Sequence, residues 1–112
     1  MPVYVDDMYK RPIGRFGRMK MSHMIADTQE ELIAMARRIG VNVQWIQDMG
    51  TYREHFDIAL SRRAIAVALG VIEISLRETV FIIECKRREL VPDIPIADAL
   101  VMLKNSDAKG EK

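Results

Sequence analysis

The sequence predicts a small α/β domain, with a three-stranded, mostly parallel sheet, helices packed against it and a helical extension at the carboxyl end. Short runs rich in β-branched and aromatic residues occur at 3–5, 41–46 and 71–74, and helical patterns of apolar residues separate and follow them. Two Ser/Thr-x-x-Glu sequences, at 28–31 and 75–78, fit capping boxes that fix helix starts. Alternating strands and helices favour a parallel sheet, and 112 residues suffice for one hydrophobic core.

The first predicted strand, residues 3–5, ends in two carboxylates, Asp6 and Asp7. In open α/β sheets the carboxyl ends of the strands are where ligands bind. The alternative is that one aspartate caps the following turn while the other is solvated.

A basic stretch follows from residue 10 to residue 20. It contains no acidic residue, and its glycines let backbone N–H groups approach an anion closely. The cations are Lys10, Arg11, Arg15, Arg18 and Lys20. The arginines could fork onto the phosphate of a nucleotide or a nucleic acid, although the spacing matches no known phosphate-binding fingerprint. The alternative is a solvated loop that balances the acidic pair before it.

The first predicted helix spans residues 29–39, where apolar residues recur at three- and four-residue spacing. Gly40 provides a left-handed stop. Residues 41–46 alternate well enough to form the second strand, in which Trp45 is expected to pack in the core.

Ser61 is the expected N-cap of a second helix that runs through Leu69. The inward face of this helix is predicted to consist of Ala64, Ile65, Ala68 and Leu69. The third strand at 71–74 then leads into a third helix over residues 76–90.

Pro92 and Pro95 mark a break after the third helix. Residues 1–91 are therefore predicted to form a single α/β domain, residues 92–104 a short final helix and residues 105–112 a disordered tail. The C-terminal helices could also join two copies of the chain.

Both histidines have polar neighbours. Ser22 and His23 follow an extended segment and lie between apolar residues, so this pair is expected at the edge of a buried surface. His55 and Asp57 lie two apart, so both should project to one side of an extended segment while Phe56 packs inward. A carboxylate beside an imidazole prepares a general base, and it equally well satisfies a structural histidine.

Arg62 and Arg63 fall in the first turn of the second helix, where two cations oppose the helix macrodipole. A bound anion, or a carboxylate such as Asp57, would explain this placement. The alternative is that the long side chains bend away into solvent.

Composition limits the classes of protein. The net charge of +1 argues against nucleic-acid binding by bulk charge, although local clusters could still act. Cys85 is the single cysteine and cannot form an internal disulfide. No signal peptide or membrane span is recognisable, so a cytoplasmic protein that does not engage membranes is expected.

An ordered series of short motifs runs through the chain: Tyr4-Val5-Asp6-Asp7, Ser22-His23-Met24-Ile25-Ala26-Asp27-Thr28, Glu30-Glu31-Leu32, Met35-Ala36, Ile39-Gly40, Trp45, His55-Phe56-Asp57-Ile58 and Arg63-Ala64. Together they resemble a family of small phage and bacterial proteins, domain of unknown function 4031, from about Val3 to Ser75. The family's usual pattern has a tyrosine at the position of Phe56. The resemblance implies a phage or prophage origin, the host bacterial cytoplasm, and a grouping of Asp6, Asp7, His23, His55, Asp57 and Arg63; it implies no activity and no cofactor.

Three classes of function follow from these residues. The first is a module that binds a nucleotide or another phosphorylated small molecule. Its pocket is predicted to hold Asp6, Asp7, Arg15, Arg18, Ser22, His23, His55, Asp57, Arg62 and Arg63. The second is a phosphoesterase or nuclease in which His23, His55 and Asp57 are the candidate catalytic residues, with or without a metal on the aspartates. The third is a protein that binds a host protein through the helices after Ser75.

Overall fold

The structure is a computed structural model that describes residues 2–88. The helix predicted at 92–104 and the tail predicted at 105–112 lie outside these residues. The strands are β1 (Val3–Val5), β2 (Arg15–Phe16), β3 (Met19–Ala26), β4 (Phe56–Ala59) and β5 (Ile72–Glu73). The helices are α1 (Gln29–Arg38), α2 (Leu60–Ala68) and α3 (Leu76–Arg87), with three 3₁₀ turns, η1 (Met8–Lys10), η2 (Pro12–Gly14) and η3 (Val43–Trp45).

The α/β class is confirmed, but the predicted three-stranded, mostly parallel sheet is wrong. The described sheet has five strands, and only the β1–β5 pairing is parallel. β3 is the long central strand and pairs antiparallel with β1, β2 and β4. Its sequence, MKMSHMIA, contains a single β-branched residue, so it lacked the composition that marks a strand. Gly17, at a φ of 62°, makes the turn that joins β2 to β3.

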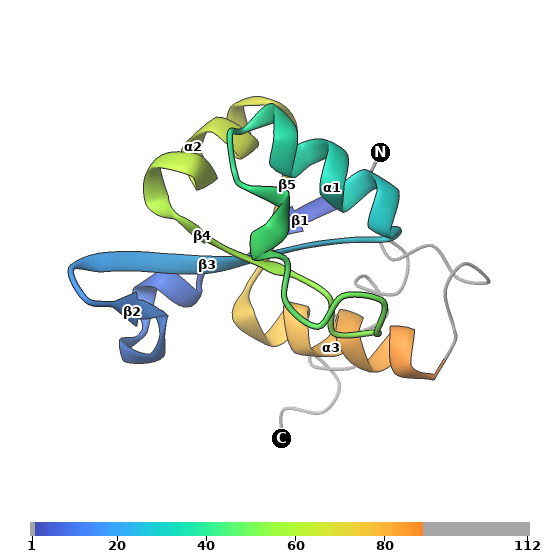
Figure 1. Ribbon diagram of the computed structural model, residues 1–112. Helices are drawn as coiled ribbons and strands as arrows, with labels where there is room; N and C mark the ends of the chain where they lie inside the picture. Colours follow the sequence, from blue (N-terminus) through green and yellow to red (C-terminus); the bar gives the residue numbers. More distant parts are fainter. Residues whose placement is uncertain (1, 89–112) are drawn as a thin grey trace, which may run out of the picture.

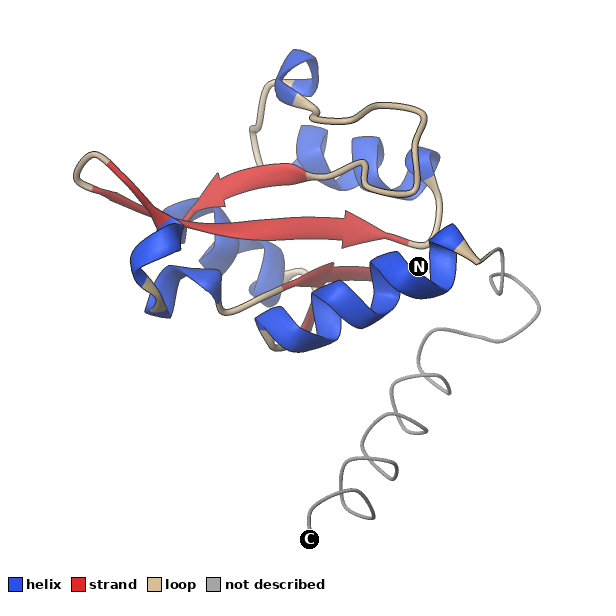
Figure 2. Cartoon of the chain, turned by 90° about the horizontal axis from the view of Figure 1, so that it is seen from below, coloured by secondary structure: helices blue, strands red, loops and turns tan. Residues whose placement is uncertain are grey.

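Helices cover both faces of the sheet. Figure 1 shows α1 and α2 on one face and α3 on the other, and Figure 2 shows the sheet and α3 from below. Alternate residues of β3 serve the two layers, because Met24 packs with the α1 and α2 side and Ile25 packs against Ile82 of α3. The face under α3 therefore has room for polar side chains where α3 does not cover it.

The predicted strand at 41–46 is wrong. The Asn42 side chain accepts a hydrogen bond from the Gln44 N–H at 2.9 Å, which turns the backbone into η3 in place of an extended strand. Trp45 is 67% exposed and does not pack in the core as predicted.

The helix starts follow the capping prediction in two of three cases. Ser75 and Glu78 form a complete capping box, and Thr28 accepts a hydrogen bond from the first turn of α1. α2 starts after Ala59 without a side-chain cap, so the predicted cap at Ser61 is wrong. Its inward face was also predicted wrongly, because Arg63 and Ala66 are the buried residues. None of the helices at residues 2–88 is long and apolar enough to cross a membrane.

Candidate functional site

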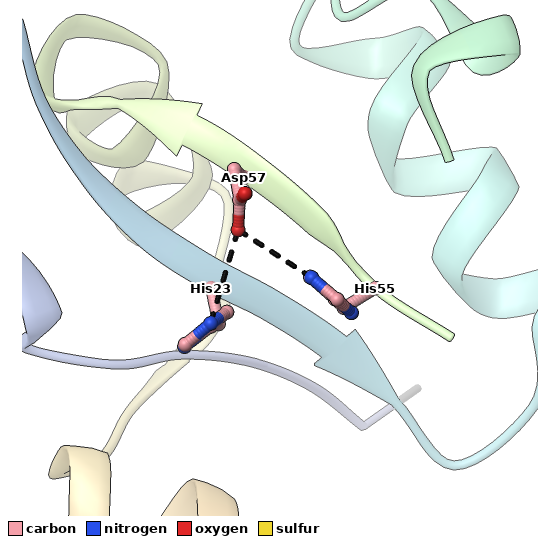
Figure 3. Close-up of side chains that lie close together, drawn as sticks. All are labelled: His23, His55 and Asp57. Carbon is pink, nitrogen blue, oxygen red and sulfur yellow. Dashed lines mark ion pairs between the residues drawn. The ribbon is translucent and has the colours of Figure 1, made fainter. Parts of the chain in front are cut away.

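Three side chains from two neighbouring strands meet on the α3 face of the sheet (Figure 3). His23 of β3 lies directly opposite Asp57 of β4 in the antiparallel register, so both project from the same face. His55 lies two residues before Asp57 and is fixed by a bridge to Gln47. The Asp57 Oδ1 atom lies 3.8 Å from His23 Nε2 and 3.5 Å from His55 Nε2.

Both imidazole rings present Nε2 to the same point. His23 Nδ1 is 2.7 Å from Asp6 Oδ2, and His55 Nδ1 is 2.7 Å from the carbonyl oxygen of Arg53. Since a carbonyl or a carboxylate oxygen only accepts, each Nδ1 carries the proton. In the neutral rings the Nε2 lone pairs are therefore free, which is the arrangement that metal-ligating histidines adopt.

Asp57 completes the group of three. Its Oδ2 accepts a hydrogen bond of 2.7 Å from the Gln47 amide, whereas its Oδ1 is buried and has no hydrogen-bond partner. A buried carboxylate oxygen without a donor is costly. In the neutral rings the neighbouring Nε2 atoms offer lone pairs, whereas protonation would turn them into donors toward this oxygen. The three atoms form a group that could hold a cation in place of a proton.

Asp6 supports the site from behind. It is fully buried, and its two oxygens accept hydrogen bonds from the Met8 N–H, the His23 N–H, the His23 ring and the Thr79 hydroxyl at 2.7–3.0 Å. Burial opposes the ionised form, but these donors hold the pKa of Asp6 below its ordinary value. Burial lowers the pKa of His23, yet the hydrogen bond and charge of Asp6, together with the charge of Asp57, raise it overall.

The three ligand atoms suit a divalent transition metal. They lie within 4.8 Å of one another. Around an ion with metal–ligand distances of ~2.1 Å, two ligand atoms of a tetrahedron lie roughly 3.4 Å apart. The three side chains would therefore have to move slightly closer together to bind the ion. Two imidazole nitrogens and one carboxylate oxygen suit Zn²⁺, Fe²⁺ or Mn²⁺, and three protein ligands leave positions open for water or substrate.

A cavity of about 330 Å³ opens beside the metal-ligand group. It is lined by His23, Ile25, Asp48, Arg53, His55, Thr79, Val80 and Ile83. Arg53 is exposed, and in the part of the chain that the structure describes its guanidinium has no carboxylate partner. The guanidinium lies over the Tyr52 ring, with 5.6 Å between its Cζ atom and the ring centre. A cavity with possible metal ligands and an exposed guanidinium favours an anionic ligand.

Three of the other predicted site residues have structural roles, and a fourth, Ser22, has a buried hydroxyl without a hydrogen-bond partner among the described residues. Asp7 accepts the Leu76 N–H at 2.8 Å and so fixes the start of α3. Arg62 donates to the Ile39 carbonyl at the end of α1. Arg63 donates to the Asp6 carbonyl and forms an ion pair with Glu73, which explains its place in the first turn of α2. Ser22 is buried, and because strand residues alternate its side chain lies on the face opposite His23.

The last two predicted residues, Arg15 and Arg18, belong to the β2–β3 hairpin and line other cavities. Phe56 is fully buried and faces the α1 and α2 core, away from Asp57. A tyrosine at this position would therefore point its hydroxyl away from the metal-ligand group. The prediction that Phe56 packs inward is confirmed.

Sequence reasoning missed Gln47, Arg53 and Thr79, which orient or flank the ligands. Their types and spacing carry no signal, because each depends on the antiparallel pairing or on the position of α3. Glu54 was also missed. It is buried and accepts hydrogen bonds from the Gly50 N–H and the Gln29 amide, and it thereby anchors the loop that carries His55.

One of the comparisons with known proteins found a match. The family model described as "Protein of unknown function (DUF4031)" matches residues 3–86. The chain belongs to this family. The match continues past Ser75, where the resemblance was expected to end, and it takes in most of α3 and therefore Thr79. No curated protein and no solved structure matches the chain.

Proposed function

We propose that this member of the DUF4031 family is a phosphoesterase that depends on a divalent metal ion. The observation that supports it is the convergence of His23 Nε2, His55 Nε2 and Asp57 Oδ1 within 4.8 Å of one another, with Asp57 Oδ1 buried and without a hydrogen-bond partner among the described residues. Each ligand residue is also held in place by a second group: Asp6 for His23, the Arg53 carbonyl for His55 and Gln47 for Asp57. Such supporting contacts are usual around metal ligands, and a surface histidine that binds nothing would gain nothing from them.

The residues around the metal would divide the work. A divalent ion at this site would supply Lewis-acid activation of a phosphate ester and of a water molecule. Asp6 fixes the tautomer of His23 so that Nε2 stays available, and the Arg53 carbonyl does the same for His55. The Arg53 guanidinium would bind a non-bridging phosphate oxygen in the adjoining cavity.

Simple binding of a phosphorylated ligand has less support. The sequence predicted arginines on the phosphate, but Arg62 and Arg63 are engaged with backbone carbonyls and Glu73. Such a binder would also have no need for two imidazoles that both present free lone pairs.

The first test is metal binding by isothermal titration calorimetry on protein freed of metal with a chelator, using Zn²⁺, Mn²⁺ and anaerobic Fe²⁺ in turn. His55→Ala and Asp57→Asn should each lower the affinity for the preferred metal at least 100-fold. The matched change Asp48→Asn, in the same cavity, should leave that affinity unchanged. Equal affinity in all four proteins would refute the site. Thermal melts of the metal-free variants should match the parent, because His55 and Asp57 lie at the edge of the core.

The second test is hydrolysis of bis(p-nitrophenyl) phosphate by the metal-loaded protein. Asp57→Asn should have no activity. The parent should lose its activity when a chelator removes the metal and regain it when metal is added back. An Arg53→Ala change should raise KM more than it lowers kcat, because Arg53 is assigned to binding. Tight metal binding without hydrolysis of any phosphate ester would keep the metal centre and reject the phosphoesterase.

A further inference from the structure

A second cavity, of about 470 Å³, lies at the base of the β2–β3 hairpin. It is lined by Tyr9, Lys10, Arg11, Pro12, Arg15 and Lys20. Four of these side chains are cationic and none is acidic, and no described carboxylate forms an ion pair with any of the four. The net charge of +1 for the whole chain conceals this cluster, which has the character of a phosphate-binding surface.

Apolar side chains are exposed beside these cations. Ile13 and Phe16 are each 70% exposed, and Met19, paired with Phe16 across the hairpin, is 47% exposed. An exposed aromatic ring next to a positively charged groove is how proteins hold single-stranded nucleic acid, since bases stack on the ring and phosphates lie among the cations. A duplex would offer its phosphates but no open base to Phe16.

The basic cavity and the metal centre share one strand. Lys20 and His23 both belong to β3, three residues and therefore roughly 10 Å apart along it, and their side chains leave opposite faces of the strand. Figure 1 shows η1, η2 and β2 below β3, on the side where α3 lies. Arg63 connects the two regions, because it donates to the Asp6 carbonyl and its guanidinium lies 4.9 Å from the centre of the Tyr9 ring. A strand that left the cavity past Tyr9 and Arg63 would reach the metal centre within a few nucleotides.

We propose that the substrate is single-stranded nucleic acid, which binds along the hairpin so that one phosphodiester reaches His23, His55 and Asp57. This inference rests on the proposed phosphoesterase function for the chemistry, but the binding surface can be tested separately. It assigns Lys10, Arg11, Arg15 and Lys20 to the phosphates and Phe16 to a base. Hydrolysis of a free nucleotide would not need this surface.

The test is fluorescence anisotropy with a labelled 20-mer of thymidine and its single-stranded RNA counterpart, in buffer with chelator so that no cleavage occurs. The double change Lys10→Ala/Arg15→Ala should weaken binding at least tenfold and lower the slope of log K against log salt by about 1.4. The matched double change Arg37→Ala/Arg38→Ala removes the same charge from the exposed end of α1 and should alter binding less than twofold. Phe16→Ala should lower the affinity for the single strands at least fivefold and the affinity for a duplex of the same length less than twofold.

Different variants test the nucleic-acid binding surface and the phosphoesterase function, so one can be rejected without the other. His55→Ala should bind the oligonucleotides as the parent does and cleave none of them, whereas Lys10→Ala/Arg15→Ala should still bind metal and hydrolyse bis(p-nitrophenyl) phosphate. Equal binding by the parent and the hairpin variants would overturn the proposal, as would a preference for duplex. Binding to vesicles with 30% phosphatidylserine, without binding to the oligonucleotides, would assign the same surface to a membrane. That result would also overturn the proposal.

Discussion

At the scale of single residues, Asp57 Oδ1 is the atom that defines the site. It is buried without a donor, while the other oxygen of the same carboxylate is satisfied by Gln47. A protein with no use for a cation would be more stable with a donor there, or with an apolar residue. The position of this oxygen beside two Nε2 atoms supports the proposed metal site.

The charge state of His23 should make the stability of the metal-free protein depend on pH. Burial lowers the pKa of His23, but Asp6 and Asp57 raise it overall above its ordinary value. The folded chain therefore favours the protonated ring more than the unfolded chain does. The resulting stabilisation is complete below the unfolded pKa of about 6.5 and is lost as the pH rises through the folded value.

Urea unfolding with chelator between about pH 5.5 and 8.5 measures this effect. The free energy of unfolding should fall as the pH rises across the range, and His23→Gln should remove most of the decline. Metal-loaded protein should show the opposite trend, because an ion competes with the proton at Nε2. A metal-free parent that gains stability with pH would contradict the assigned direction of the shift.

Part of the arrangement of the site residues could be predicted from the sequence. The spacing of His55 and Asp57 placed both on one side of an extended segment, which the structure confirms. That His23 faces Asp57 could not be predicted, since it depends on the register of two strands that are far apart in sequence. The roles of Arg62 and Arg63 were also out of reach, because their partners are backbone carbonyls and, for Arg63, also the side chain of Glu73 in β5.

At the scale of elements, local signals predicted the helices better than the strands. Capping depends on residues three apart, so Thr28 and Ser75 marked the starts of α1 and α3 correctly. Strands depend on partners elsewhere in the chain. Residues 41–46 look like a strand but have no strand beside them in the described sheet. β3 has only one β-branched residue and is central because three strands pair with it.

Two serine substitutions separate a real cap from an apparent one. Ser75→Ala removes an N-cap that accepts the Glu78 N–H, and it should lower the free energy of unfolding by about 1 kcal/mol. Ser61→Ala should change it by less than about 0.5 kcal/mol, because Ser61 is exposed and lies inside α2. Urea unfolding of both variants in one buffer gives the comparison. Equal losses would mean that Ser61 caps α2 after all.

At the scale of the whole molecule, Gly14 holds the basic hairpin against the sheet. A Cβ atom at Gly14 would lie 2.2 Å from the carbonyl oxygen of Met8 and 3.0 Å from that of Met21. Backbone atoms cannot give way as a flexible side chain can. The segment from η1 to β2 is therefore packed closely onto β3, the strand that carries His23.

Gly14→Ala should accordingly cost about 1–3 kcal/mol of stability and loosen the hairpin. Gly17→Ala is the control, since a Cβ there meets no atom and costs only about 1 kcal/mol for its positive φ. Limited trypsin digestion should cut after Lys10 and Arg15 faster in Gly14→Ala than in Gly17→Ala. Equal digestion rates in the two variants would show that the hairpin is not held by this contact.

The oxygen of Asp57 that lacks a donor also has a consequence for the protein inside a cell. An ion present at 100 times its dissociation constant would add about 2.7 kcal/mol to the folded state, which is a large share of the stability of so small a domain. Starvation for that ion would therefore increase the fraction of molecules open to proteases. We expect the half-life of the chain, and with it the amount present, to follow the supply of the metal.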